Sequence, residues 1–233
     1  MMSKEEEHVE GGEKIRSIIL GLNDGLISTF TLLIGVAAAT LSGGNSVVIL
    51  TGLAAMVSGA CSMGLGEYIS SKSEYNYIIN EIKREGAEIE LFPDEEKEEV
   101  RGIFEKMGFK GEQLDSCVET ITSDKKIWHD FLIKSELGLE VPDNPTFGAI
   151  LTFIAFSFGA FIPLFPYFLN LGLVSLLISS SLSFGMLFTV GMLKTRITGE
   201  KPLKGAIEMV IIGIIAFIVS FLIGLVLNQL IIT

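Results

Sequence analysis

The stretch TFGAILTFIAFSFGAFIPLFPYFLNLGLVSLLISSSLSFGMLFTVGML, residues 146–193, contains no charged residue. A membrane-spanning helix needs about 20 predominantly apolar residues, so this stretch is too long for one span and suits two. The sequence Asn170-Leu171-Gly172 near its middle favours a tight turn. The stretch therefore predicts a pair of membrane helices and places the chain among membrane proteins.

Three further stretches are apolar enough to cross a membrane. Residues 17–41 carry one acidic residue, Asp24, and residues 46–71 carry one, Glu67, whereas residues 209–233 carry no charge. With the first pair they predict an all-α membrane protein with five spans. Because the number is odd, we expect the two termini on opposite sides of the membrane.

The composition indicates that part of the chain lies in water. Of its 233 residues, 49% are hydrophobic and 19% are charged, and the formal net charge is −11. An acidic chain lacks the basic footprint of a nucleic-acid binder, so we expect no nucleic acid among its partners. Two cysteines and two histidines leave little for a disulfide framework, a zinc finger or a haem site. We expect no permanently bound cofactor.

The charges divide the chain into four parts. We expect an acidic tail over residues 1–13, two spans within 14–71, a cytoplasmic helical module over 72–145, and three spans within 146–233. The acidic tail lacks the basic region of a signal peptide. In the module, the proline at position 93 is predicted to end one helix, and Asp94 to cap the next.

Basic residues predict the orientation in the membrane. All 17 lysines and arginines lie before residue 17, in residues 72–145 or in the connection 194–204. Because basic segments stay in the cytoplasm, we expect the N-terminus and the module inside and the C-terminus outside. No organellar targeting segment is evident, and we expect a prokaryotic cell membrane.

The module carries most of the negative charge, with 19 acidic and 10 basic residues. Glu85 and Glu88 share a helix face, and Glu96 and Glu99 repeat the spacing on the next helix. If the turn at Pro93 folds these helices together, four carboxylates converge into a site for divalent cations such as Fe²⁺ or Mn²⁺. The alternative is a solvated acidic surface paired with nearby lysines and arginines.

Asp24 is a functional candidate because an ionisable residue inside a span is costly. Gly21 and Gly25 flank it in a G-x-x-x-G pattern that allows close approach of another helix. Ser28 lies one turn further along the same span. Asp24 and Ser28 are therefore candidates for a transport pathway.

The second span adds Met63 and Glu67, which lie one turn apart on one face. Carboxylates with a thioether sulfur suit a borderline metal ion such as Fe²⁺, and carboxylates inside a membrane also carry protons. The alternatives are that Glu67 reaches water at the end of the span and that Met63 fills the core.

Two other function classes remain open from the residues alone. A membrane-bound di-iron enzyme needs Glu-x-x-His pairs inside a helical core. Glu5 precedes His8 only in the tail, and no acidic residue lies three positions before His129. We therefore expect no enzyme. A metal-responsive membrane protein without transport is the second alternative.

Four motifs together resemble the vacuolar iron transporter family. The resemblance covers the chain from about Lys14 onward. It is carried by Asn23-Asp24-Gly25-Leu26-Ile27-Ser28, Ser62-Met63-Gly64-Leu65-Gly66-Glu67-Tyr68, Trp128-x-Asp130-Phe131 and Glu136-Leu137-Gly138-Leu139-Glu140.

The resemblance implies a homodimer in the lipid bilayer that moves Fe²⁺, and often Mn²⁺, out of the cytosol by proton antiport. The pathway would lie at the two-fold interface, lined by the first two spans of both protomers. Asp24 and Met63 match the metal positions in the membrane. The metal ligands of the cytoplasmic domain match Glu85, Glu88, Glu96, Glu99 and Glu136.

Three positions depart from the family pattern. Ala55 stands where well-studied members have a glutamate, and Glu67 stands where some members have glycine. Leu132 replaces a methionine ligand of the cytoplasmic domain.

Overall fold

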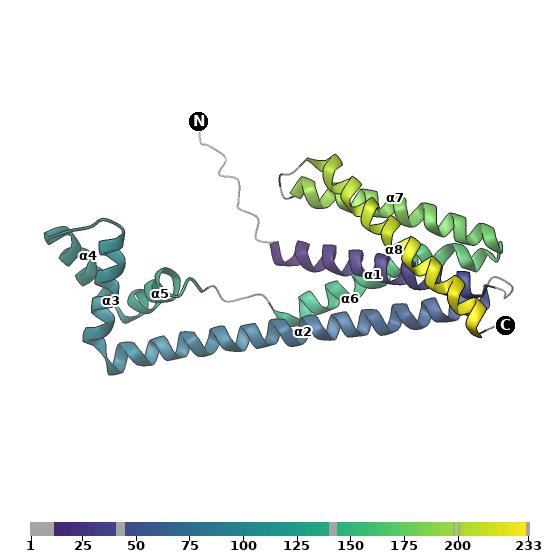
Figure 1. The fold of residues 1–233 in the computed structure, drawn as a ribbon. Coiled ribbons are helices and arrows are strands. Elements are labelled where there is room, and N and C mark those ends of the chain that lie inside the picture. Colours follow the sequence, from purple (N-terminus) through teal and green to yellow (C-terminus); the bar gives the residue numbers. More distant parts are fainter. Residues whose placement is uncertain (1–11, 41–44, 140–143, 198, 200, 232–233) are drawn as a thin grey trace, which may run out of the picture. The chain divides into compact units, whose positions relative to one another are not determined.

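The computed structural model describes residues 12–40, 45–139, 144–197, 199 and 201–231, and all elements in them are helices (Figure 1). Most of the predicted acidic tail, with His8, lies outside these residues, as does Glu140. The elements are α1 (Gly12–Ala39), α2 (Ser46–Leu91), α3 (Pro93–Lys106), α4 (Glu112–Thr122), α5 (Lys125–Ser135), α6 (Pro145–Leu164), the 3₁₀ helix η1 (Phe165–Leu169), α7 (Leu173–Ile197) and α8 (Pro202–Ile231).

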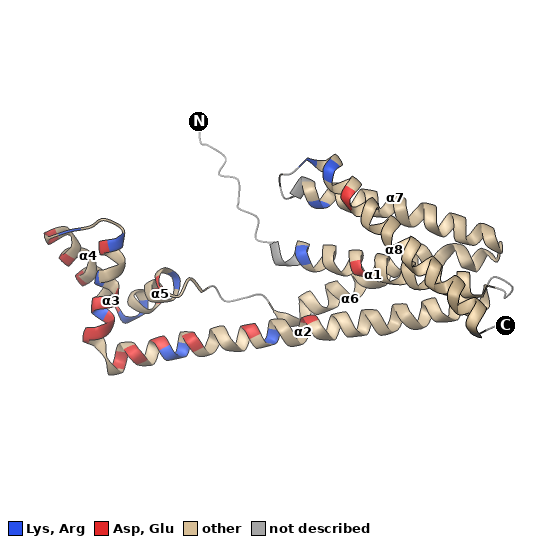
Figure 2. Cartoon of the chain, viewed as in Figure 1, with Lys and Arg blue, Asp and Glu red and all other residues tan. Residues whose placement is uncertain are grey.

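Five of the described helices are long and apolar enough to cross a membrane, which confirms the predicted number of spans. They are Ile15–Ala39, the apolar part of Ser46–Leu91, Pro145–Leu169, Leu173–Thr195 and Pro202–Leu230. Figure 2 shows that charged residues gather in α3 to α5 and in the second half of α2, whereas the spans carry few. The chain is therefore a multi-pass membrane protein.

The chain divides into two compact units. Residues 1–68 and 146–233 form what we call the membrane unit, and residues 69–145 form the acidic module. The long helix α2 begins in the membrane unit and ends in the acidic module.

Helix α1 occupies the centre of the membrane unit, where it packs against α7 and α8. Leu26, Phe30 and Leu33 on this helix are fully buried. A side chain on Gly25 would overlap the backbone of Phe156 in α6, so the predicted close approach of another helix occurs here. Gly25 thus brings α1 close to α6 one residue away from Asp24.

The turn predicted in the stretch 146–193 lies where expected. Asn170 adopts a left-handed conformation with φ 51°, and Gly172 follows with φ 60°. Before it, α6 gives way to the 3₁₀ helix η1 just after Pro163, since proline disrupts α-helical hydrogen bonding. The Ser179 hydroxyl on α7 donates to the Pro163 carbonyl at 2.7 Å and joins the two spans.

The predicted start of the last span at residue 209 was wrong. Helix α8 begins at Pro202 and includes Lys204 and Glu208. Proline is favoured in the first turn of a helix, where its missing N–H has no helical partner. The uncharged stretch from residue 209 identified only the apolar part of this helix, and not its charged first turns.

The acidic module has its own hydrophobic core. It consists of buried side chains from α2 to α5: Ile89, Val100, Leu114, Val118, Trp128 and Leu132. The predicted break at Pro93 is present, but Asp94 does not cap α3; it lies inside the first turn, and Phe92 precedes the helix without a side-chain cap. Pro93 itself takes the first helical position, so the helix starts two residues earlier than a cap at Asp94 would place it.

Candidate functional site

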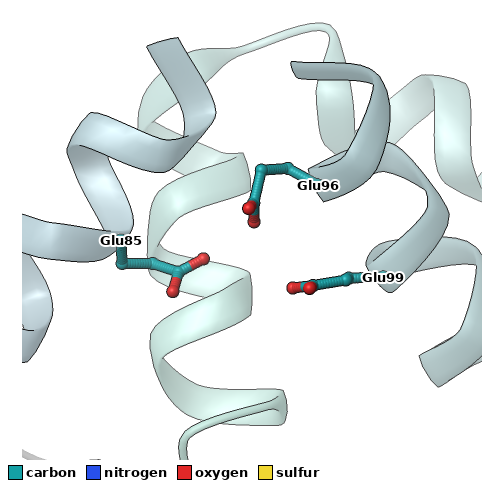
Figure 3. A group of neighbouring side chains, drawn as sticks. All are labelled: Glu85, Glu96 and Glu99. Carbon is teal, nitrogen blue, oxygen red and sulfur yellow. The ribbon is translucent and has the colours of Figure 1, made fainter. Parts of the chain in front are cut away.

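Three glutamates from two helices converge in the acidic module (Figure 3). Glu85 lies on α2, and Glu96 and Glu99 lie three residues apart on α3. Each offers a carboxylate oxygen, and these oxygens all lie within 4.8 Å of one another. The chain turns at the non-helical Phe92 between α2 and α3, and the three side chains meet next to this turn. We call this group the glutamate cluster.

Two members of the glutamate cluster are buried. Glu85 is 4% exposed and Glu96 is 6% exposed. The Oε1 atom of Glu85 and the Oε2 atom of Glu96 have no hydrogen-bond partner among the described residues. A buried carboxylate without a partner costs free energy unless it is protonated or neutralised by a cation. Oxygen donors from several carboxylates are the ligands that hard divalent cations and Mn²⁺ prefer.

The pKa values of two glutamates in the module are raised by burial and by neighbouring carboxylates. Burial is the main cause that raises the pKa of Glu96 to about 7, and repulsion by Glu99 and Glu85 raises it further. Partial burial likewise raises the pKa of Glu136 to about 7, and the contact with the Glu99 carboxyl adds to the shift. These groups exchange protons near neutral pH, where cations compete with protons for the same oxygens.

Metal binding by the module is expected to strengthen as the pH rises from 6 to 8. Over this range Glu96 and Glu136 pass from mostly protonated to mostly ionised, because the pKa of each is about 7. Each carboxyl contributes up to roughly a tenfold gain in affinity for Mn²⁺. Calorimetric titration of the full chain at the two pH values measures the gain. An affinity that does not change with pH would contradict a role for these two carboxyls.

The stability of the metal-free module is expected to fall as the pH rises. A pKa raised above the usual 4.5 means that folding favours the protonated carboxyl. The resulting stabilisation is complete below about pH 4.5 and is lost as the pH rises through about 7. The module should therefore unfold at a lower temperature at pH 8 than at pH 5, until a divalent cation is added.

The other two predicted ligands of the module lie beside the glutamate cluster. The Glu88 carboxylate pairs with Arg84 on its own helix at 3.2 Å. It is therefore not one of the three converging groups, although its charge still raises the pKa of Glu96. Glu136 follows α5 and contacts the Glu99 side chain.

A cavity of about 710 Å³ lies between the helices of the membrane unit. The predicted pathway residues Asp24, Ser28 and Met63 all line it. Asp24 is exposed to the cavity, and the Ser28 hydroxyl donates to the Asp24 backbone carbonyl. The cavity lining thus includes a carboxylate from α1 and a thioether sulfur from α2.

Sequence reasoning missed the contribution of α8 to this cavity. Ser220, Ile223, Gly224 and Leu227 form part of its wall. Ser220 and Gly224 lie one helical turn apart, and a side chain on Gly224 would overlap the backbone of Gly35 on α1. Small residues at this spacing mark a close helix contact, and this signal is visible in the sequence.

A sequence model of the VIT family matches residues 15–225. The chain belongs to the VIT family. It is 37% identical over 219 residues to vacuolar iron transporter 1 of Arabidopsis thaliana, covering 93% of this chain and 87% of the relative. It is 36% identical to a vacuolar iron transporter of Centaurea cyanus (93% and 89%) and 32% identical to that of Plasmodium falciparum isolate 3D7 (96% and 86%).

Membership in the VIT family confirms that the chain is not an enzyme, since the named relatives are transporters. The His129 ring also has a structural role, because its Nε2 lies 2.8 Å from the Ile82 carbonyl oxygen. The relatives are eukaryotic, so the comparison gives no support to the expectation of a prokaryotic membrane.

Two departures from the VIT-family pattern lie at the sites described above. Ala55 lines the cavity and leaves its wall apolar at that point. Leu132 is fully buried in the core of the acidic module, so a side chain of this size serves packing there.

Glu67, the third departure, is not part of the cavity lining in this VIT-family chain. Its Oε1 accepts a hydrogen bond of 3.0 Å from the Ser17 hydroxyl of α1. Gly148 of α6 lies on another side of the carboxylate, since a Cβ built there would be 3.5 Å from the same oxygen. Glu67 therefore lies where three helices meet, rather than free in solvent.

Proposed function

We propose that this VIT-family protein transports divalent metal ions, Fe²⁺ and also Mn²⁺, out of the cytosol. The observation that carries the proposal is the membrane cavity with Asp24 and Met63 in its wall. A carboxylate and a thioether together suit a borderline ion such as Fe²⁺ better than Mg²⁺ or Ca²⁺. Relatives named vacuolar iron transporters support the choice of iron.

The glutamate cluster supports a role in collecting the ion. Two buried carboxylates with unpartnered oxygens favour a cation strongly, and the acidic module has a large excess of negative charge. Such a module raises the local concentration of cations at its surface. We propose that Glu85, Glu96 and Glu99 hold the metal, with Glu136 and Glu88 beside them.

A homodimer would complete the transport pathway. Asp24 is an exposed side chain in a membrane span of the single chain, and a carboxylate facing lipid is costly. A second copy placed over the open side of the cavity would shield both Asp24 side chains. The pathway then lies between α1 and α2 of the two protomers.

The proposed direction follows from the orientation. All 17 basic residues lie in segments assigned to one side of the membrane. The positive-inside rule assigns that side to the cytosol, together with the N-terminus and the acidic module. Cations gathered there would leave the cytosol, and protons moving inward through the same carboxylates would drive the exchange.

A metal-responsive protein without transport is the second candidate, because the glutamate cluster needs no ion flux in order to bind metal. Ion flux into liposomes separates the two candidates. The purified chain is expected to carry Fe²⁺ and Mn²⁺ faster when a pH gradient is imposed, and to carry Ca²⁺ poorly. Metal binding without flux of any ion would contradict transport and favour the second candidate.

A further inference from the structure

A hydrogen bond joins α1 to α2 near the end of the membrane unit. The Ser17 hydroxyl donates to Glu67 Oε1 at 3.0 Å across 50 residues of sequence. Ser17 is only 5% exposed, so neighbouring residues pack closely around its side chain. Among the described residues Ser17 is the hydrogen-bond partner of this carboxylate. No hydrogen bond to its second oxygen, Oε2, is found within the part of the chain that the structure describes.

The Ser17–Glu67 pair lies in line with the cavity residues along both helices. Ser17 precedes Asp24 by two helical turns on the same face of α1, or about 10 Å along the axis. Glu67 follows Met63 by one turn on the same face of α2, or about 6 Å. The pair therefore forms the next layer beyond Asp24 and Met63, on the side where α2 continues towards Lys72.

We propose that this layer is a second cation position on the transport route, with Glu67 as the ligand and Ser17 as its positioning residue. The inference rests on the proposed transport function. The hydrogen bond from the Ser17 hydroxyl to Oε1 restricts rotation of the Glu67 carboxylate. The other oxygen, Oε2, can then coordinate a divalent cation on the transport route. The chain would thus hold a cation near Glu67 before or after it reaches Asp24 and Met63.

The position of Glu67 argues against the simpler interpretation of an acidic residue reaching water. A snorkelling glutamate needs no partner on another span. Here the carboxylate meets α1 through Ser17 and α6 at Gly148, where a Cβ would lie 3.5 Å from Oε1 and 3.9 Å from the Ser17 Oγ. Three helices therefore define its surroundings.

The test is Fe²⁺ flux into liposomes that contain the full chain, measured anaerobically over a range of Fe²⁺ concentrations. Glu67→Gln is expected to raise KM about tenfold, and Ser17→Ala about threefold, with the maximal rate changed less than about twofold. Ser17→Thr keeps the hydroxyl and should restore the wild-type KM. An unchanged KM in Glu67→Gln would overturn the inference.

Two controls separate this role from packing. Glu74→Gln removes the same charge from α2 seven residues further along, and Ser180→Ala removes a hydroxyl that donates to the Leu176 carbonyl of its own helix. Both should leave KM unchanged. If Ser17→Thr raises KM as much as Ser17→Ala, the hydroxyl is not the feature that matters, and the positioning role is wrong.

A binding measurement keeps this inference distinct from the transport proposal. Mn²⁺ titration of the full chain in detergent should show weaker binding in Glu67→Gln than in Glu74→Gln, whether or not the chain carries flux. Absence of flux in the wild-type chain would overturn the transport proposal alone. Equal Mn²⁺ binding by the two variants would overturn the second cation position alone.

Discussion

Replacement of Asp24 by asparagine is expected to reduce Fe²⁺ flux about 100-fold. The side chain keeps its size but loses the negative charge that faces the cavity. Loss of one member of a desolvated ion pair costs about 3 to 5 kcal/mol, which corresponds to a factor of 100 or more in an equilibrium. Initial rates of Fe²⁺ flux into liposomes measure the effect.

Glu208→Gln is the matched control for this variant. Glu208 is an exposed carboxylate on α8 of the membrane unit, and it is not among the residues that line the cavity. Its replacement should leave the flux within about twofold of wild type, as is usual for a surface charge. Full flux in Asp24→Asn, with Glu208→Gln also active, would rule out the cavity as the route.

The double variant Glu85→Gln with Glu96→Gln is expected to weaken Mn²⁺ binding by the acidic module at least 100-fold. It removes the two buried carboxylates of the glutamate cluster and leaves their shape. Without metal the same variant should be at least as stable as wild type at pH 8, because both desolvation and repulsion by Glu99 are relieved. Calorimetric titration and thermal unfolding give the two readouts.

Glu95→Gln with Glu105→Gln serves as its control. Both residues are exposed on α3, outside the glutamate cluster, and the change in net charge is the same. If this control weakens Mn²⁺ binding as much as the buried pair does, the module attracts cations by its overall charge rather than through a defined site.

The membrane architecture was predictable because lipid imposes a simple rule on sequence. Stretches of about 20 apolar residues are typical of membrane spans, so the uncharged stretches predicted the five spans, and the sequence Asn170-Leu171-Gly172 predicted the turn. The beginning of α8 could not, since hydropathy marks the lipid-facing part and not the helix. Lys204 and Glu208 are compatible with a helix that extends beyond it.

The glutamate cluster was predictable only in outline. Spacing assigned Glu85 with Glu88, and Glu96 with Glu99, to shared helix faces, and Pro93 located the turn between them. Which of the four converge depends on tertiary packing and on competition from neighbouring charges. The i,i+4 spacing of Arg84 and Glu88 allows the observed pair, but the convergence of Glu85 with Glu96 and Glu99 depends on how α2 and α3 pack.

The contacts of Glu67 could not be predicted from helical periodicity. Helical spacing placed it on the face of Met63, but it does not line the same cavity. Its partner Ser17 is separated by 50 residues, and the contact arises from the packing of α1, α2 and α6. No local pattern identifies a serine as the partner of a particular carboxylate.

Trp128 gives the acidic module an optical signal of its own. It is the single tryptophan of the chain, and it lies 4% exposed in the core formed with Ile89 and Leu132. Its fluorescence emission should therefore shift to longer wavelength when this core opens to water, while unfolding of the spans leaves it unchanged. A membrane protein of five spans thus permits its water-exposed part to be followed separately, in the intact chain and without an added dye.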